Sequence, residues 1–523
     1  MYVQIYERPA KLRAFFVIKG LIMKNIFFET KYLKAPHLFY KDFCNKENTI
    51  LFESAEIVDK SGVQSLIGLS AALKITCDDL NVTVKALNTN GTALLKLLST
   101  DLNATICNNS FSISYTRPNK NLDEYSRLKS EGPFSVLRAL QKHIKECNDI
   151  FIGGTIAFDF INNYEYIGDV PKGENPCSDY TFFVFDVSVR VNHIEKTTKV
   201  NAYVFADDAY KDTAFTALSM KETLDDFDKE DTLNIDFKVK PNINPDLNDQ
   251  EFSKIVNAIK EHIIKGDAFQ VVPSRTFSLD CKDPLLAYTY LKKLNPSPYM
   301  YFIHDENFTL FGASPEFAVR YEANNRQVSI SPIAGTRARG LNADGTINRE
   351  LDSRIELELR TDRKEVAEHL MLVDLARNDI ARISKPGTRY VDNMLHVDKY
   401  QSVMHLVSDV HGTLRDDLDG LHAYLACMNM GTLSGAPKIK AHELIYKYEG
   451  KKRGSYGGTV CILSNDGSLD SCIAIRSAFV KNEKAYVQAG CGVVFDSNIS
   501  AECLETVNKA KSVLTAITMA KAE

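Results

Sequence analysis

The 523-residue sequence has no tryptophan, no pair of cysteines spaced as C-x-x-C and no apolar run long enough to span a membrane. Its eleven cysteines are scattered, which argues against a disulfide framework or a cysteine-based zinc site and favours reduced thiols. The longest apolar stretch, residues 15–23, is interrupted by Lys19 and Gly20. We therefore predict a cytoplasmic protein without a membrane segment.

The sequence also lacks an excess of basic residues, since its formal net charge is −5. A nucleic-acid-binding protein usually carries a basic field, so we predict no nucleic-acid partner. The content of 44% hydrophobic and 25% charged residues is ordinary for a globular protein. No Walker A sequence is present, which removes one common class of phosphate-binding enzyme.

Short alternating runs separated by turn residues indicate many antiparallel strands, with helical patterns between them. We predict an α+β fold and four parts. Residues 1–22 form an extension of uncertain role, 23–224 an N-terminal part, 225–249 a linker poor in apolar periodicity, and 250–523 a catalytic domain.

Two helical segments carry carboxylates at helical spacing. Glu365 and Glu368 share a face of the predicted helix over residues 360–382, and Glu502 and Glu505 share a face near the C-terminus together with Lys509. Such faces are most often only solvated. If the two helices meet, however, hard oxygen ligands without a cluster of cysteine or histidine favour Mg²⁺ over zinc.

Several turns rich in glycine and hydroxyl residues have the character of anion sites: residues 331–340, 430–438, 453–460 and 489–497. Arg476 lies in an otherwise apolar strand pattern and needs a partner, either a substrate carboxylate or a structural acid. Each turn could also serve packing alone. Together they indicate a small polyanion, a phosphate or a dicarboxylate, bound with a divalent cation.

From about residue 51 to residue 520 the chain resembles the chorismate-utilising enzymes, and among them the large, aminating subunits of the anthranilate synthases. The matching motifs are SPEF, SPIAGTRARG, KEVAEHLMLVDLARND, MHLVSDVHG, GTLSGAPK, GSYGG, AIRSA, QAGCGVVFDS and AECLETVNKA. This resemblance implies an α/β sandwich of two largely antiparallel sheets with outer helices and a deep active-site cleft.

The resemblance also implies roles for site residues. Glu368 and Glu505 are expected to bind magnesium, with Glu365 and Glu502 in support. The carboxylate clamp is expected to comprise Tyr456, Arg476, Gly490, Gly492 and Lys509.

Glu316 is expected to be the general acid that protonates the departing 4-hydroxyl group of chorismate. Thr432, Gly335 and Thr336 are expected beside the ring. His405 is expected to assist the loss of pyruvate, although a histidine in this setting is more often a core residue.

The implied reaction is Mg²⁺-dependent amination of chorismate at C2 by ammonia, followed by loss of pyruvate to give anthranilate, the first committed step of tryptophan biosynthesis. Related aminodeoxychorismate synthases use a lysine where this chain has Ala334, and isochorismate synthases use a lysine base where it has Gln270. Both residues favour ammonia as nucleophile. The alternatives are those sister chemistries and a non-catalytic tryptophan-binding scaffold.

The chain has no G-x-C-x-G nucleophile turn for glutamine hydrolysis outside the predicted substrate turn, so the resemblance implies a separate glutamine amidotransferase subunit in a heterotetramer. It also implies feedback inhibition by tryptophan, because LFESAE and NPSPYM match the two inhibitor-binding elements of the family. The expected inhibitor-binding residues are Glu53, Ser54, Pro298, Tyr299 and Met300.

Overall fold

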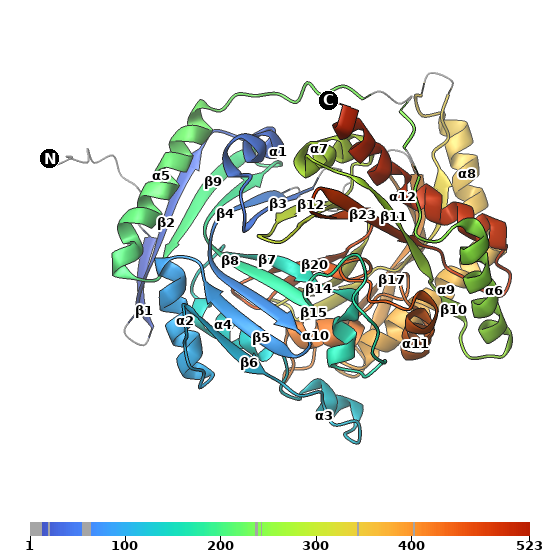
Figure 1. Cartoon of the computed structure of the whole chain (residues 1–523), viewed down its shortest axis with the longest axis horizontal. Helices are drawn as coiled ribbons and strands as arrows, with labels where there is room; N and C mark the ends of the chain where they lie inside the picture. Colours follow the sequence, from blue (N-terminus) through green and yellow to red (C-terminus); the bar gives the residue numbers. More distant parts are fainter. Residues whose placement is uncertain are drawn as a thin grey trace.

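A computed structural model describes residues 13–18, 21–54, 64–235, 239–241, 243–342, 345–400 and 403–522 (Figure 1). Strands occupy the middle of the molecule, and helices lie around its rim, with α5 and α2 on the left of the view and α6 and α8 on the right. No described helix is long and apolar enough to cross a membrane.

The helices are α1 (Pro36–Phe39), the π-helix η1 (Tyr40–Cys44), α2 (Thr89–Asp101), α3 (Glu124–Leu128), α4 (Ser135–Ile144), the 3₁₀ helices η2 (Phe158–Asn163) and η3 (Asp207–Ala209), α5 (Tyr210–Asp226), α6 (Asp249–Ile264), α7 (Pro284–Leu294), α8 (Arg349–Thr361), α9 (Arg363–Ala381), α10 (Gly420–Cys427), α11 (Lys438–Glu449) and α12 (Ile499–Ala522).

The strands are β1 (Arg13–Ile18), β2 (Leu21–Thr30), β3 (Thr49–Glu53), β4 (Gln64–Asp78), β5 (Asn81–Ala86), β6 (Ser110–Ser114), β7 (Phe151–Ile156), β8 (Tyr180–Asn192), β9 (Thr197–Val204), β10 (Gln270–Val271), β11 (Ser274–Asp280), β12 (Tyr299–His304), β13 (Thr309–Ser314), β14 (Phe317–Glu322), β15 (Gln327–Ile330), β16 (Ile333–Ala338), β17 (Tyr390–Lys399), β18 (Val403–Thr413), β19 (Gly435–Ala436), β20 (Thr459–Leu463), β21 (Leu469–Ile473), β22 (Ser477–Lys481) and β23 (Lys484–Gly490).

The strands pair antiparallel, for example β4 with β8 and β11 with β23, which confirms the predicted α+β class. Among the described residues, the predicted two sheets are joined through shared strands into one network of 21 strands, with β10 and β19 as a separate ribbon. Strands from the two halves of the chain pair directly, since β3 lies beside β12 and β7 beside β20.

The predicted linker lies between α5 and α6. The division of the chain at residues 225–249 stays a prediction, because strands before and after it belong to one hydrogen-bonded network. Residues 1–12 and 19–20 of the predicted extension lie outside the described residues, while 13–18 form β1, which pairs with β2.

Local sequence explains where two helices next to the site begin. Asn248 and Glu251 form a capping box at the start of α6. The single helix predicted over residues 360–382 is divided at Asp362, whose side chain accepts hydrogen bonds from the backbone N–H groups of Lys364 and Glu365 and so starts α9. Glu365 therefore lies in the first turn of α9.

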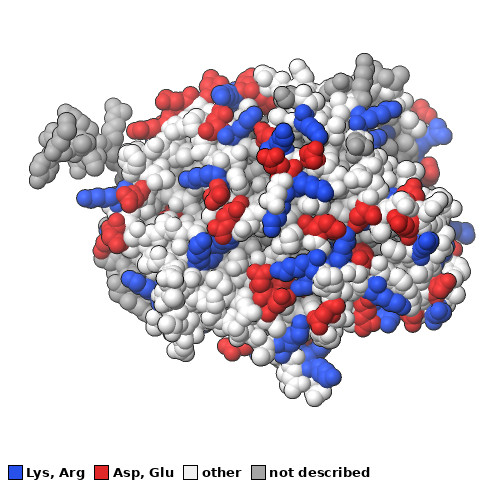
Figure 2. Space-filling view, in the orientation of Figure 1, with Lys and Arg blue, Asp and Glu red and all other residues white. Residues whose placement is uncertain are grey.

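Most of the apolar core lies between the strand network and the outer helices. One large cluster surrounds β4, β8 and α10 and contains Leu73, Phe182 and Tyr424. A second lies against α7 and α12 and contains Phe302 and Leu514. On the face shown in Figure 2, acidic and basic side chains are interspersed, as the small net charge suggests.

Candidate active site

A buried acid lies in the turn between β13 and β14. The Glu316 side chain is only 6% exposed, and Thr432 Oγ1 donates a hydrogen bond to its Oε1 at 3.0 Å. Burial raises the pKa of Glu316 to about 8, although Thr432, Lys509 and Arg476 oppose this. The carboxyl group therefore holds a proton at neutral pH, as a general acid must.

A neutral histidine lies on β18. His405 Nδ1 is 3.0 Å from Thr336 Oγ1 and 3.4 Å from the carbonyl oxygen of Gly335. Burial and the charge of Arg476 lower the pKa of His405 to about 4. The structure thus places His405, the residue expected to assist pyruvate loss, next to Gly335 and Thr336, two residues expected beside the ring.

Gly335 is the bulged residue of β16, between the pairs formed by Ala334 and Thr336 with β18. Its φ is +70°, and a Cβ atom there would lie 3.0 Å from Glu365 Oε2. Only glycine satisfies both the left-handed backbone and the close approach of α9. The predicted substrate loop therefore packs directly against the helix that carries Glu365 and Glu368.

Arg476 lies between β21 and β22 with a φ of +49°. Among the described residues, no hydrogen bond or ion pair of its guanidinium group is found, although its charge acts on Tyr456, Glu505 and Glu316. Burial lowers the pKa of Arg476 from its usual value. A poorly solvated cation without a partner favours an anionic ligand.

Lys509 on α12 stands opposite the glycine turn after β23. Its Nζ donates to the carbonyl oxygen of Gly490 at 3.0 Å and lies 2.6 Å from Glu505 Oε1. A Cβ atom on Gly490 would lie 2.6 Å from the Pro273 carbonyl oxygen and 3.1 Å from Tyr456 Oη. The predicted clamp residues Tyr456, Gly490 and Lys509 are therefore neighbours.

The carboxylates of α9 and α12 differ in their partners. Arg337 Nη1 donates to Glu365 Oε1 at 2.8 Å, and Lys509 pairs with Glu505. Burial and the neighbouring Glu365 raise the pKa of Glu368 to about 7. Burial also raises the pKa of Glu502, whose Oε2 is buried without a hydrogen-bond partner among the described residues. The charge of Lys364 acts on both Glu368 and Glu502, but in the described part of the chain neither forms an ion pair.

Among the described residues, no three histidine, cysteine, aspartate or glutamate side chains converge closely enough to hold a metal ion. Proteins usually bind Mg²⁺ through one or two carboxylates and complete its shell with water and substrate oxygens. The orphaned Glu502 oxygen and the like-charge environment of Glu368 fit a cation bound in this way.

Gln270 and Ala334 are buried, at 1% and 8% exposure. Gln270 Oε1 has no hydrogen-bond partner among the described residues. A Cβ atom on Gly492 would lie 3.1 Å from Glu368 Oε1 and 3.6 Å from the Gln270 side-chain amide. An unused hydrogen-bond acceptor thus lies beside the predicted metal carboxylate and the predicted substrate turn.

The arginines of SPIAGTRARG have structural partners. Arg337 pairs with Asp362 and Glu365 of the α9 start, and Arg339 binds Asp352 of α8 through both Nε and Nη2. They stabilise the two helices that follow the loop.

The two predicted inhibitor elements are adjacent strands, since Glu53 of β3 is the register partner of Met300 of β12. Pro298 immediately precedes β12, whereas Ala55 and Glu56 of the LFESAE element lie outside the described residues. Ser54 Oγ is buried and has no hydrogen-bond partner within the part of the chain that the structure describes, and Tyr299 Oη donates to Asp470.

The Glu53 carboxylate is already occupied. It accepts hydrogen bonds from Tyr288 Oη at 2.7 Å and Lys292 Nζ at 2.8 Å. Although burial opposes ionisation, Lys292 and His37 hold the pKa of Glu53 well below its usual value. In the described part of this element, Ser54 Oγ is the atom left without a hydrogen-bond partner, and the role of Glu53 in inhibitor binding stays a prediction.

The sequence patterns did not single out Arg453, Glu449 and Asp159 individually, although all three are buried around the GSYGG turn. Asp159 Oδ2 accepts a hydrogen bond from the Gly454 backbone at 2.7 Å, and burial raises its pKa to about 6. The sequence signal that could have identified Arg453 is its position directly before Gly454, at the start of the glycine-rich turn.

Comparison with known proteins gives consistent findings. The profile of the chorismate binding enzyme family matches residues 101–515. Anthranilate synthase component 1 of Vibrio cholerae serotype O1 is 47% identical over 506 residues, covering 94% of this chain and 95% of the relative. The component 1 of Escherichia coli strain K12 is 46% identical over 507 residues, covering 94% and 96%.

Solved structures agree. Anthranilate synthase component I from Streptococcus pneumoniae TIGR4 aligns with a TM-score of 0.67 at 29% identity, covering 88% of this chain and 94% of that chain. The menaquinone-specific isochorismate synthase from Escherichia coli also aligns with a TM-score of 0.67, covering 95% and 94%. At 15% identity it shows a shared fold alone.

Proposed function

Because the chain belongs to the family of chorismate-binding enzymes, we propose that it converts chorismate and ammonia to anthranilate and pyruvate. The observation that carries this proposal is Glu316, a buried acid that keeps its proton at neutral pH beside Thr432. Amination at C2 expels the 4-hydroxyl group, which needs a proton to leave as water.

Substrate binding rests on the cations of the site. Arg476 has no partner of its own among the described residues, so its guanidinium group is available for the enolpyruvyl carboxylate. Lys509 lies beside the Gly490 turn and contributes a second positive charge. A planar fork of donors together with backbone groups suits a carboxylate.

Glu368 and Glu505 would hold Mg²⁺, with Glu502 in support, and the ring carboxylate of chorismate would complete the shell. When bound, the metal supplies positive charge that stabilises the developing negative charge on the substrate. The protein holds these acids on α9 and α12, and Lys509 and Arg337 limit the repulsion among them.

In the first step, the nitrogen of ammonia forms a bond to C2 and loses one proton to solvent. Both ring double bonds shift, from C1=C2 and C5=C6 to C1=C6 and C4=C5, and the 4-hydroxyl group leaves as water with the Glu316 proton. In the second step, a proton leaves C2, the bond from C3 to the enolpyruvyl oxygen breaks, and the ring becomes aromatic. The enolpyruvate gains a proton and becomes pyruvate. His405 has a pKa of about 4 and is therefore neutral, which leaves one ring nitrogen unprotonated and available for the C2 proton.

The choice of nucleophile is supported by two residues. Ala334 has no group that can attack the substrate, and Gln270 cannot act as a base on water. The buried, unpaired Gln270 Oε1 can instead accept an N–H hydrogen bond from ammonia. These residues argue against aminodeoxychorismate and isochorismate as products, and the acidic and basic side chains around them argue against a scaffold.

The test is incubation of the purified chain with chorismate, Mg²⁺ and ammonium salt, followed by anthranilate fluorescence. We expect product with ammonium and none with glutamine, until a glutamine amidotransferase subunit is added to form the proposed heterotetramer. A chelator should stop the reaction and added Mg²⁺ restore it. Formation of isochorismate or aminodeoxychorismate would contradict the proposal. A cytoplasmic location stays a prediction.

We also propose that tryptophan binds at the edge where β3 ends and β12 begins and inhibits the reaction. Ser54→Ala should raise the tryptophan concentration for half-inhibition about 10- to 150-fold, because one hydrogen bond to a charged ligand contributes about 1.5–3 kcal/mol. Its turnover should be unchanged, since Ser54 Oγ bonds to no described residue.

Ser188→Ala is the matched control, because Ser188 is a buried serine on β8, a strand that does not pair with β3 or β12. Its inhibition should equal that of the wild type. Equal inhibition of the Ser54 variant and the wild type would place the inhibitor elsewhere.

A further inference from the structure

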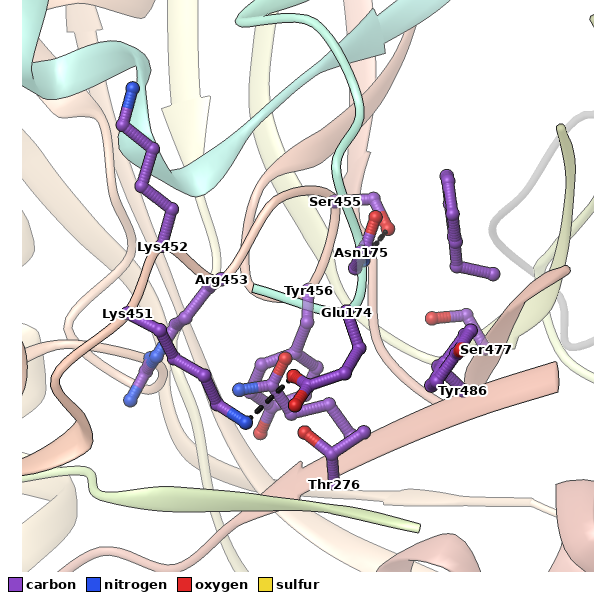
Figure 3. A pocket seen from close by; sticks show the side chains of 12 residues that line it. Glu174, Asn175, Thr276, Lys451, Lys452, Arg453, Ser455, Tyr456, Ser477 and Tyr486 are labelled. Carbon is purple, nitrogen blue, oxygen red and sulfur yellow. Dashed lines mark hydrogen bonds and ion pairs between the residues drawn. The ribbon is translucent and has the colours of Figure 1, made fainter. Parts of the chain in front are cut away.

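A fully buried arginine lies directly behind the predicted substrate site. Arg453 is 1% exposed and lines a pocket together with Tyr456, Thr276 and, from the N-terminal half, Asn175 (Figure 3). Its guanidinium carbon lies 4.5 Å from the Phe158 ring centre and 5.6 Å from that of Tyr456. It therefore contacts both halves of the chain and one clamp residue.

The guanidinium group uses its donors on three separate segments. Nη1 donates to the Leu433 carbonyl oxygen at 2.8 Å, and Nη2 to the Val272 carbonyl oxygen at 2.6 Å. Nε donates to Glu449 Oε2 at 2.9 Å. Burial by itself would lower the pKa of Arg453. The charge and the hydrogen bonds of Glu449 outweigh this effect, so the pKa of Arg453 is raised.

Each of these segments holds a site residue in place. Leu433 follows Thr432, the hydrogen-bond donor to Glu316. Val272 precedes Pro273, whose carbonyl oxygen accepts a hydrogen bond from the Cys491 N–H between Gly490 and Gly492. Arg453 therefore binds the carbonyl group of the residue after Thr432. It also binds the carbonyl group of the residue before Pro273, which contacts the turn between Gly490 and Gly492.

The Glu449 carboxylate, which binds Arg453, also contacts the strand that pairs with Gly490. Glu449 Oε1 accepts hydrogen bonds from the backbone N–H and the hydroxyl of Ser274, both at 2.8 Å. Ser274 is the register partner of Gly490 in the pairing of β11 with β23. Asp159 fixes the Gly454 backbone from the N-terminal half, which orients the turn leading to Tyr456.

From these contacts we propose that Arg453, paired with Glu449, is a positioning residue that fixes the segments of Thr432, Tyr456 and Gly490 relative to one another. The inference rests on the proposed function for the roles of those three residues. A planar guanidinium group can bind two carbonyl groups and a carboxylate in fixed directions, whereas the ammonium group of lysine cannot reproduce that fork.

The test is Arg453→Lys, assayed as chorismate consumption so that the result does not depend on which product forms. We expect kcat/KM to fall at least about 30-fold, with a higher KM and a lower kcat, because both the clamp and the partner of Glu316 lose their placement. The rise in Tm that chorismate gives the wild type should also largely disappear.

Lys74→Met is the control, because Lys74 forms a buried ion pair with Asp305 at 2.6 Å, away from the site. It should lose stability and keep kcat/KM within about twofold of the wild type. If Arg453→Lys does not fold, Glu449→Gln replaces it, with an expected loss of about tenfold.

A folded Arg453→Lys or Glu449→Gln enzyme with wild-type kcat/KM and a full chorismate-induced rise in Tm would overturn the proposal, as would an equal loss of activity in Lys74→Met. If the wild type consumes chorismate but makes another product, the proposed function fails while this test still stands.

Discussion

Replacing Glu316 with glutamine will lower kcat for anthranilate formation about 10²–10⁴-fold while leaving the fold intact. Glutamine has the shape of the protonated acid and can still accept the hydrogen bond from Thr432, but it has no proton to give to the leaving hydroxyl group. The measurement is anthranilate fluorescence at saturating chorismate, with circular dichroism to verify folding.

The pH dependence sharpens this result. Burial raises the pKa of Glu316 in the folded protein to about 8, well above the ordinary value for a glutamate, so the fold favours its protonated form. The stability that this preference gives is present at low pH and is lost as pH rises through about 8. The wild-type rate at a fixed concentration of unprotonated ammonia should fall over the same range.

Thr432→Val is the companion variant. The Thr432 hydrogen bond lowers the pKa of Glu316, so its removal should move the alkaline fall of the rate to higher pH. A Glu316→Gln enzyme that retains more than about a tenth of the wild-type kcat would show that another group protonates the leaving oxygen.

Much of the fold was predictable because the local patterns and the tertiary structure agree. The alternating residues of β8 and β9 and the capped start of α6 mark those elements directly. The break at Asp362 was missed because an aspartate within a helical pattern reads equally well as an exposed helix residue or as an N-cap. In the structure Asp362 is the N-cap of α9, and its side chain also pairs with Arg337 of β16.

The sequence predicts which residues form the candidate site, but it does not predict the charge balance among them. Sequence spacing places Glu365 and Glu368 on one helix face, but it does not show that Arg337 pairs with the first and leaves the second unpaired. For the same reason the sequence does not show that the Glu53 carboxylate accepts hydrogen bonds from Tyr288 and Lys292. Such partners come from elements far apart in the chain.

A physical rule unites the predicted substrate and metal residues. Buried charges that serve structure have partners, as Arg453 has Glu449 and Lys74 has Asp305. Arg476, by contrast, lacks an ion-pair partner among the described residues, and Glu502 leaves a buried oxygen unbonded. Unpaired charged groups of both signs in the candidate site suit a ligand that brings an anion and a cation together.

Arg476→Met tests this rule and should have opposite effects on stability and activity. Its unfolding free energy should stay equal to that of the wild type or rise by up to about 4 kcal/mol, because an unpaired, poorly solvated cation is replaced by an apolar side chain of similar length. The φ of +49° strains either residue, so it does not alter the comparison. Meanwhile kcat/KM for chorismate should fall about 10²–10⁴-fold through loss of two charge-assisted hydrogen bonds.

Arg127→Met is the matched control, since Arg127 is also largely buried but pairs with Glu165 at 2.7 Å. Its replacement leaves that acid without a partner, so stability should fall while chorismate turnover is unchanged. Urea unfolding and chorismate turnover measured on both variants separate the two roles. If Arg476→Met instead loses as much stability as Arg127→Met, its guanidinium group has a structural partner, and a different cation must bind the substrate carboxylate.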